Sequence, residues 1–259
     1  MLNDKHITKL VDYFDSTECF PGVDISGGVC YFLWDRDNEG VCEIETIRSG
    51  QKSTMLRPLL ENGSNAFIRF NEAINIVHKI KEKQERNFAD IVSSRKPFGL
   101  PTNIAVKEKK IKDSVKIYAY PKNGFVSRAE IINNENWINM NKVLIANSYG
   151  ERGSFPYLVL SKPFIGEIDS CCSETYLVIG PFKTTEESSN VINYIKTKFV
   201  RFLVLLIKNT QHATKNVYSF VPMQDFSEPW TDEKLYKKYG LAQEEIAFIE
   251  CMIKPMGEE

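Results

Sequence analysis

Closely spaced glycines of the kind that hold a nucleotide are absent from this sequence. No two of its 14 glycines are separated by a single residue, and no two of its 11 prolines are adjacent. A nucleotide-type cofactor site at a strand end usually needs Gly-x-Gly, because glycine lets the backbone approach the ligand closely. The sequence therefore offers no such site, and we expect no cofactor to bind this chain.

Metal-ligating side chains are also scarce. The chain has three His (His6, His78 and His212) and six Cys with no Cys-x-x-Cys, a spacing that argues against structural zinc. Scattered cysteines without a signal peptide indicate reduced thiols. The most apolar segment, residues 199–207, contains Arg201 and is too short to cross a bilayer. We expect a cytoplasmic protein with no membrane association.

The charge balance excludes a uniformly basic protein that wraps nucleic acid. The 259 residues carry 33 Lys and Arg against 34 Asp and Glu, for a net charge of −1. A local basic face remains possible, because so many cations can be unevenly placed. The length permits one or two domains with a real hydrophobic core.

The front of the chain carries its most distinctive segment, FPGVDISGGVCYFLWDRDNEG, at residues 20–40. Residues 29–34 form an apolar run typical of a strand buried on both faces. An Asp- and Asn-rich turn ending at Gly40 follows, and residues 41–47 alternate apolar with polar. We predict a β-hairpin of these two strands, preceded by an apolar stretch at residues 5–15 that leads to a strand.

Later segments predict a domain with both helices and strands. Apolar residues at steps of three and four predict a helix at residues 65–86, and Thr184 with Glu187 forms a capping box that opens a long helix. Asn123-Gly124 predicts a hairpin. Short strands are expected at residues 116–120, 125–132, 142–146, 157–160 and 176–179, and a helical pair from Thr231 to Met252. This order predicts an α+β fold, a mainly antiparallel sheet with packed helices.

Three polar loops combine cations, amides and aromatic rings. Such residues contact phosphates and base edges, so the loops predict a DNA-binding groove if the fold brings them together. On separate faces they would be ordinary solvated loops. The candidate residues are Ser94, Arg95, Lys96, Phe98, Asn103 and Lys110 in and after the first loop, Asn147, Tyr149 and Arg152 in the second, and Gln211, His212 and Lys215 in the third.

Two alternatives use other residues. Asp90, Glu108 and Lys110 fit loosely the Asp and Glu-x-Lys pattern of a Mg²⁺-dependent nuclease. The final helices could instead dock on a partner subunit through Leu235, Tyr236, Ile246, Phe248 and Ile249. Vicinal Cys171 and Cys172 are expected to pack rather than react.

Several motifs resemble one enzyme family. FPGVDISGGVCYFLWDRD resembles the closing strands of N6-adenine DNA methyltransferases of type II restriction–modification systems. SSRKPFGLPTN, the strand at residues 142–146 and residues 173–211 look like their C-terminal, TaqI-like specificity domain. VPMQDFSEPWTDEKLYKKYGL is similar to the usual tail of that family.

The resemblance implies a target-recognition role for nearly the whole chain. Residues 1–48 would be the C-terminal edge, a hairpin remnant, of an α/β methyltransferase domain. Residues 49–89 would be a linker with a helix, and residues 90–259 the DNA-specificity domain. The family's S-adenosylmethionine and Asn-Pro-Pro-aromatic motifs are absent here. We therefore expect no catalytic residue in this chain, which would be inactive alone, and expect double-stranded DNA and a missing or separate methyltransferase half as partners.

Overall fold

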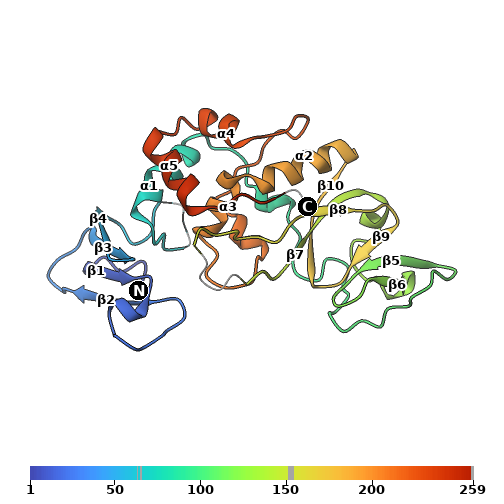
Figure 1. Ribbon diagram of the computed structural model, residues 1–259, viewed down its shortest axis with the longest axis horizontal. Coiled ribbons are helices and arrows are strands. Elements are labelled where there is room, and N and C mark those ends of the chain that lie inside the picture. The colour runs from blue at the N-terminus through green and yellow to red at the C-terminus, as the bar shows by residue number, and fades with distance from the viewer. Residues whose placement is uncertain (63, 65, 151–154, 258–259) are drawn as a thin grey trace. The chain divides into compact units, whose positions relative to one another are not determined.

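The computed structural model describes residues 1–62, 64, 66–150 and 155–257 (Figure 1). The chain divides into two compact units, Met1–Lys79 and Ile80–Glu259, here called the N-terminal and C-terminal units. The described residues contain five α-helices and three small sheets in which most strand pairs are antiparallel. The fold is therefore α+β, as the order of segments predicted.

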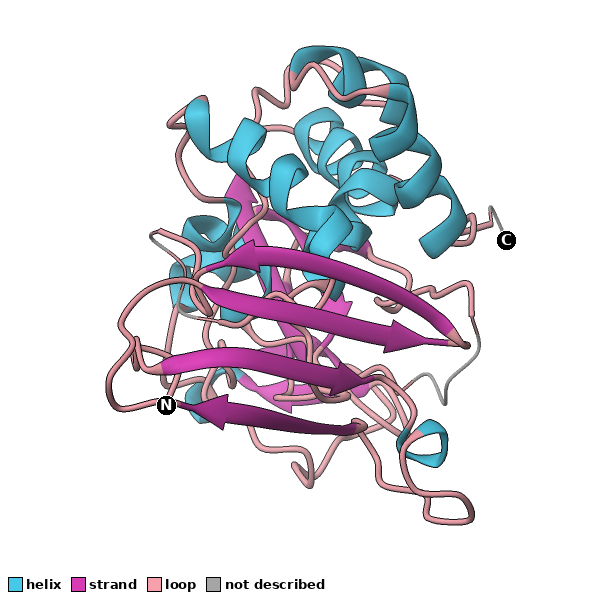
Figure 2. Ribbon diagram, turned by 90° about the vertical axis from the view of Figure 1, so that its left-hand side faces the viewer, coloured by secondary structure: helices cyan, strands magenta, loops and turns pink. Residues whose placement is uncertain are grey.

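The N-terminal unit is built on a four-stranded sheet, seen in Figure 2 as neighbouring strands. The strand order is β2-β1-β3-β4, with β1 parallel to β3 and the other pairs antiparallel. The bounds are β1 Ile7–Tyr13, β2 Val29–Trp34, β3 Cys42–Arg48 and β4 Gln51–Arg57.

The predicted hairpin between β2 and β3 is wrong, because β1 lies between these strands. β2 pairs with β1 through Tyr13↔Val29 and Leu10↔Phe32, whereas β3 pairs with the other edge of β1. The turn after β2 bonds to the chain ahead of β1, with the N–H of Gly40 donating to the carbonyl of Lys5 at 3.0 Å. The sequence correctly indicated a turn after β2. This turn joins β2 to β3, and β1 lies between these two strands in the sheet.

The glycines ahead of β2 serve this strand pairing. Gly28 has φ +81°, and a Cβ there would lie 2.1 Å from the carbonyl oxygen of Tyr13 at the end of β1. Only glycine permits this close approach of the backbone. The paired glycines therefore bring β2 alongside β1.

Burial also differs from the expectation for β2. The predicted strand was to be buried on both faces, yet Tyr31, Phe32, Leu33 and Trp34 are 46–60% exposed. β2 is the last strand of its sheet, where Trp34 contacts the ring of His6 and Tyr31 contacts that of Tyr13, with centroids 5.6 and 6.4 Å apart. An apolar run therefore identified a strand but not its burial.

Residues 49–79 fall within the N-terminal unit. β4 completes the sheet, and the buried Asn71 donates to the carbonyls of Ile44 and Ser53, both at 3.0 Å. Buried Arg57 on β4 donates to the Oδ1 of Asn71 at 3.0 Å. The two units divide after Lys79.

The C-terminal unit contains two three-stranded sheets, ordered β10-β7-β8 and β6-β5-β9. One core cluster includes buried residues of both, such as Ile117 on β5 and Leu144 on β7. The strands are β5 Ser114–Tyr118, β6 Gly124–Ser127, β7 Asn141–Ala146, β8 Phe164–Gly166, β9 Ser170–Cys172 and β10 Tyr176–Phe182. The Asn-Gly hairpin forms between β5 and β6. No strand forms at residues 157–160, and β8 and β9 were not foreseen.

The predicted start of the helix after Thr184 agrees with the structure, whereas the predicted helix lengths do not. They are α1 Ile74–Glu82, α2 Thr185–Lys196, α3 Lys198–Leu205, α4 Asp232–Lys238 and α5 Gln243–Met252. Thr184 and Glu187 form the predicted capping box. The predicted long helix is broken at Thr197, whose hydroxyl accepts from the N–H of Val200 and caps α3. The predicted helix at residues 65–86 shortens to α1 and the preceding 3₁₀ turn Asn71–Ala73.

The C-terminal helices turn their apolar residues inward. Leu235 and Ile249 are fully buried, and Tyr236 is 6% exposed. Phe248 contacts the ring of Phe202 on α3 with centroids 5.7 Å apart. Leu235, Tyr236 and Ile249 therefore form part of the unit's own core, whereas Ile246 and Phe248 are half-buried. In the part of the chain that the structure describes, no helix is long and apolar enough to cross a membrane.

Candidate nucleic-acid interface

The turn between β9 and β10 brings the three predicted loops together. Glu174 in this turn donates its N–H to the carbonyl of Leu100 in the first loop, at 2.9 Å. The carbonyl of Thr175 accepts from the N–H of Asn147 in the second loop, at 2.8 Å. We call residues 94–103, 147–149, 173–175 and 211–213 the loop cluster.

The second and third loops pair directly. The N–H of Tyr149 donates to the carbonyl of Gln211, and the N–H of Ala213 donates to the carbonyl of Asn147, both at 2.8 Å. Ser148 and His212 form an antiparallel bridge between these two bonds. The third loop is therefore fixed to the second by backbone bonds, independent of side-chain identity.

Glu174 also fixes the first loop through its side chain. Thr102 donates from its N–H and its hydroxyl to Oε1 of Glu174, both at 3.0 Å. Oε2 lies 3.0 Å from Nε of Arg95 and 3.6 Å from Nζ of Lys96. Burial acts to raise the pKa of this carboxyl, but the Thr102 bonds and the two cations hold it below its usual value. Glu174 is thus an anionic anchor under a cationic loop.

The exposed members of the loop cluster are available to a ligand. Arg95 and Lys96 have side chains 67% and 46% exposed although they pair with Glu174. Ser94, Asn103, Gln211 and His212 are also exposed, and Tyr149 is half-buried. Lys215, half-buried, opens the 3₁₀ turn that follows the third loop.

Two candidates are buried and cannot meet a ligand in this structure. Phe98 is fully buried and packs edge-on against Trp137, with ring centroids 6.5 Å apart, so the expected exposed stacking ring is wrong. Asn147 is 7% exposed and joins the loops through its backbone. Arg152 lies outside the described residues.

Lys110 lies elsewhere on the C-terminal unit and is engaged there. Its Nζ pairs with Asp169 at 3.0 Å, and Asp169 also pairs with Arg128 at 3.2 Å. Glu108, the other part of the expected nuclease motif, pairs with Lys122. Among the described residues no group of three or more His, Cys, Asp or Glu could hold a metal ion. Glu108 and Lys110 therefore have structural partners, whereas Asp90 is exposed.

Sequence reasoning missed Glu174 and the burial of Arg201. Glu174 is the one charged residue between Ser170 and Phe182, a signal that could have marked it as an anchor. Arg201 on α3 is fully buried and donates to the carbonyls of Leu158 and Lys254 at 3.3 and 2.8 Å. It ties α3 to the C-terminal segment.

The vicinal cysteines pack, as predicted. Cys171 and Cys172 are free and fully buried on β9. Burial raises the pKa of the Cys171 thiol to about 12 and that of Cys172 well above its ordinary value. Neither thiol is a nucleophile near neutral pH.

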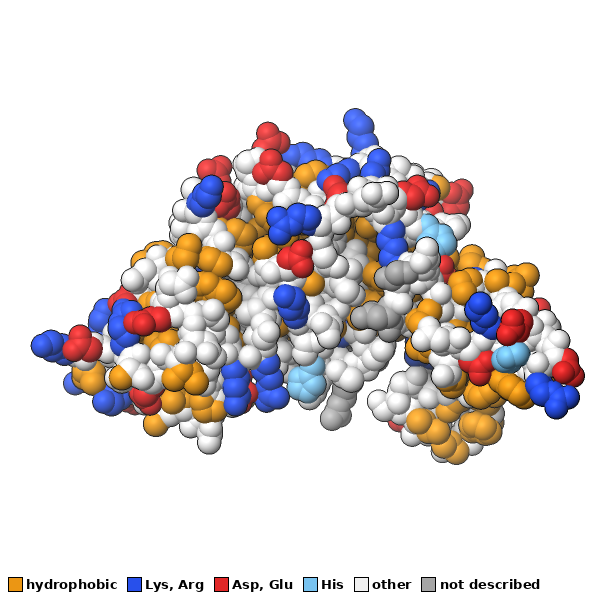
Figure 3. Space-filling view, turned by 180° about the vertical axis from the view of Figure 1, so that it is seen from behind, with side chains coloured by type: hydrophobic (Ala, Val, Ile, Leu, Met, Phe, Trp, Pro, Cys, Tyr) orange, Lys and Arg blue, Asp and Glu red, His pale blue; other side chains and the backbone are white. Residues whose placement is uncertain are grey.

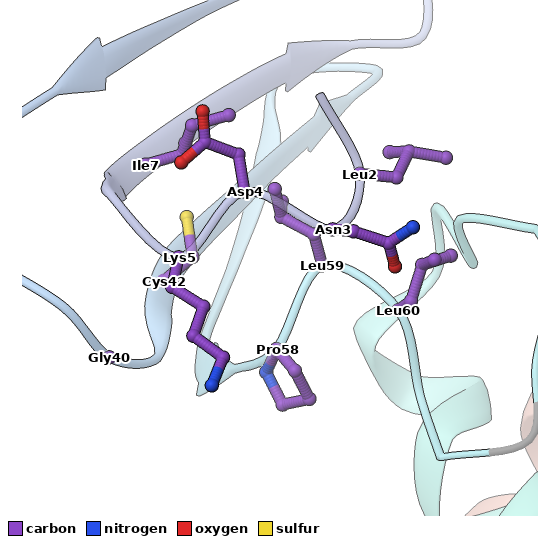
Figure 4. A pocket seen from close by; sticks show the side chains of 10 residues that line it. All are labelled: Leu2, Asn3, Asp4, Lys5, Ile7, Gly40, Cys42, Pro58, Leu59 and Leu60. Carbon is purple, nitrogen blue, oxygen red and sulfur yellow. The ribbon is translucent and has the colours of Figure 1, made fainter.

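A small pocket lies in the N-terminal unit, where residues before β1 meet those after β4 (Figure 4). Its volume is about 170 Å³, below the roughly 300 Å³ at which small-molecule sites begin. It is lined by Leu2, Asn3, Asp4, Lys5, Ile7, Gly40, Cys42, Pro58, Leu59 and Leu60.

Comparison with known proteins gives one short relationship. No family model matches the chain. A stretch of 42 residues is 43% identical to an uncharacterized adenine-specific methylase of Mycoplasma pneumoniae. The match covers 16% of this chain and 10% of that protein. It supports a relationship to methyltransferases.

Proposed function

We propose that this chain is the DNA-recognition portion of a restriction–modification adenine-N6 DNA methyltransferase, with catalysis supplied by another methyltransferase half. The gathering of three polar loops around Glu174 carries the proposal. The loops present Arg95, Lys96, Asn103, Gln211 and His212 from distant parts of the sequence. The similarity to an adenine-specific methylase supports a relationship to this enzyme class.

The chemistry of these side chains suits duplex DNA. Lys96 and Arg95 can pair with phosphates, and the planar guanidinium of arginine can also donate two bonds to guanine. Asn103 and Gln211 carry amides of the kind that pair with adenine. The backbone bonds between loops hold the groups in place before DNA arrives, which lowers the entropy lost on binding.

Duplex binding tests the proposal directly. Fluorescence anisotropy should show binding that weakens steeply with salt, because each phosphate contact releases counterions. Arg95→Ala should weaken binding by about five- to thirtyfold, the equivalent of roughly 1–2 kcal/mol. If Arg95 contacts a phosphate, the salt slope should fall by about one unit.

Arg36→Ala is the matched control. It removes the same charge from the exposed turn after β2, in the other unit. Equal affinity for the wild type and Arg95→Ala would remove the first loop from the interface. No binding at low salt, even with a methyltransferase half present, would refute the proposal.

A further inference from the structure

Lys96 in the first loop has a backbone conformation that lysine rarely adopts. Its φ is +58°, in the left-handed region, which is less favourable for a residue with a Cβ than for glycine. The next residue is Pro97, and the residue before a proline favours extended backbone instead. The surrounding structure therefore holds Lys96 in a strained conformation, and strain of this kind is typical of ligand-binding and switching segments.

Fixed segments lie on both sides of this strained residue. On one side, Ser93 donates its N–H to the carbonyl of Val178 at 2.8 Å, and its hydroxyl accepts from the N–H of Val178 at 2.9 Å. On the other side, the carbonyl of Pro97 accepts from Nδ2 of Asn134 at 2.6 Å, and Phe98 is fully buried. The chain on either side is therefore attached to the body of the C-terminal unit.

The three residues between these fixed segments, Ser94, Arg95 and Lys96, are held less firmly. We call them the cationic span. Among the residues that the structure describes, the backbone groups of Ser94 and Arg95 form no hydrogen bond, and Lys96 accepts one, from the N–H of Gly99 at 2.9 Å. The cationic span can therefore change its backbone conformation with the loss of few hydrogen bonds.

The side chain of Lys96 is held by a long ion pair. Its Nζ lies 3.6 Å from Oε2 of Glu174, and Nε of Arg95 lies closer to the same oxygen, at 3.0 Å. The Lys96 side chain is also 46% exposed. Figure 3 shows Lys and Arg side chains on the surface of the C-terminal unit, at the left of the view. An anion outside the protein can therefore compete for Lys96, while Arg95 remains with Glu174.

We propose that the cationic span closes on a DNA phosphate. Lys96 leaves Glu174, its backbone turns to the extended conformation favoured before proline, and its ammonium pairs with the phosphate. The identity of this anion rests on the proposed function. Because the strain of the free protein is relieved in the complex, bound DNA favours the extended conformation of the span. Lys96 is thus a positioning residue as well as a charge.

Two uncharged replacements of Lys96 separate backbone conformation from charge. Lys96→Gly adopts the left-handed conformation freely, whereas the β-branched side chain in Lys96→Val strongly disfavours it. In urea unfolding followed by the fluorescence of Trp137, Lys96→Gly should be the more stable of the two. In fluorescence anisotropy with duplex DNA at low salt, the order should reverse. Lys96→Val should bind about five- to thirtyfold more tightly than Lys96→Gly, because closure removes the strain that valine adds to the free protein.

Gln84 provides the matched control for backbone strain outside the loop cluster. It is exposed and also has a left-handed backbone, with φ +51°. Gln84→Gly should be more stable than Gln84→Val, as at position 96, but the two should bind duplex DNA equally. Where Lys96→Val does not fold, Lys96→Ala takes its place and should still bind more tightly than Lys96→Gly, by a smaller ratio.

Two results would overturn closure of the span. These are equal duplex affinities of Lys96→Gly and Lys96→Val, and tighter binding by Lys96→Gly, since either means that the left-handed conformation persists in the complex. If binding still depends on Arg95 in that case, DNA recognition stands and only closure fails. If the wild type binds no duplex at low salt, the proposed function fails and closure fails with it.

Discussion

Replacing Glu174 tests how the first loop is built. Glu174→Ala removes two bonds accepted from Thr102 and the ion pairs with Arg95 and Lys96. Thr102 is exposed to solvent, so we assign its two bonds the contribution of a typical hydrogen bond, about 1 kcal/mol each. The ion pairs add only about 0.5 kcal/mol together, because both cations are well exposed. We expect a loss of about 2–3 kcal/mol in the free energy of unfolding.

Glu174→Gln separates geometry from charge. Its amide oxygen can still accept from Thr102, so the loss should be no more than about 1 kcal/mol. Urea unfolding followed by the fluorescence of Trp137, which packs in the core beside Phe98, measures both losses. Equal losses for the two variants would show that the Thr102 bonds do not hold the loop.

Glu174→Gln and Glu174→Ala should change the affinity for DNA in opposite directions. Glu174→Gln removes a negative charge beside Arg95 and Lys96 and keeps the loop in place, so duplex binding should strengthen. Glu174→Ala should weaken binding, because the loop loses its anchor. Weaker binding by both variants would contradict the view that the carboxylate competes with phosphate for the cations.

The dependence of stability on acid pH gives an independent check of the role of Glu174. The pKa of Glu174 is lowered in the folded state, so its contribution to stability is present above about pH 4.5. This contribution is lost as pH falls through the lowered folded pKa. The stability difference between the wild type and Glu174→Gln should therefore shrink in acid. A difference that stays constant below pH 4 would refute the assignment.

Three further predictions concern other parts of the molecule. Lys142→Met should lower stability by about 2–4 kcal/mol in urea, because it orphans the carbonyls of Ile138, Met140 and Glu167, which now accept from the buried ammonium at 3.0–3.1 Å. Burial lowers the pKa of Lys142 to about 8, so the wild type should gain stability relative to this variant from about pH 8 to 10.5, where the unfolded chain binds more protons. Gly28→Ala should destabilise the N-terminal unit more than Gly22→Ala in thermal unfolding. Both residues have φ above +80°, but only at Gly28 would the Cβ meet a backbone oxygen, at 2.1 Å, and equal effects would contradict the close approach. Iodoacetamide at pH 8 should label exposed Cys251 in the native protein and leave Cys171 unlabelled until urea is added, as mass spectrometry of peptides would show.

Local features of the sequence were read correctly because each depends on a few neighbouring residues. The Thr184–Glu187 capping box, the Asn-Gly hairpin and the start of α4 after Thr231 all form as predicted. Strands β7 and β10 appear within one to three residues of the expected ends. A cap or a turn selects its conformation locally, whatever surrounds it.

Pairing and burial required the tertiary structure. The composition of β2 indicates a strand, but its pairing with β1 depends on the path of the chain from Tyr13 to Gly28. Phe98 stands in a polar loop and Arg201 carries a charge, yet distant segments bury both side chains. The spacing of apolar residues in the sequence indicates whether a segment forms a strand or a helix. Which segments cover that strand or helix depends on residues far away in the chain.

Part of the candidate interface could likewise be predicted from the sequence, and part of it required the tertiary structure. The sequence by itself determined which loops are polar and which carry cations, because composition is local. Only the tertiary structure decided that these loops meet at Glu174 and that Lys110 lies elsewhere, paired with Asp169. The reason is that a backbone bond such as Asn147 to Thr175 joins segments whose separation along the chain gives no sign of their contact.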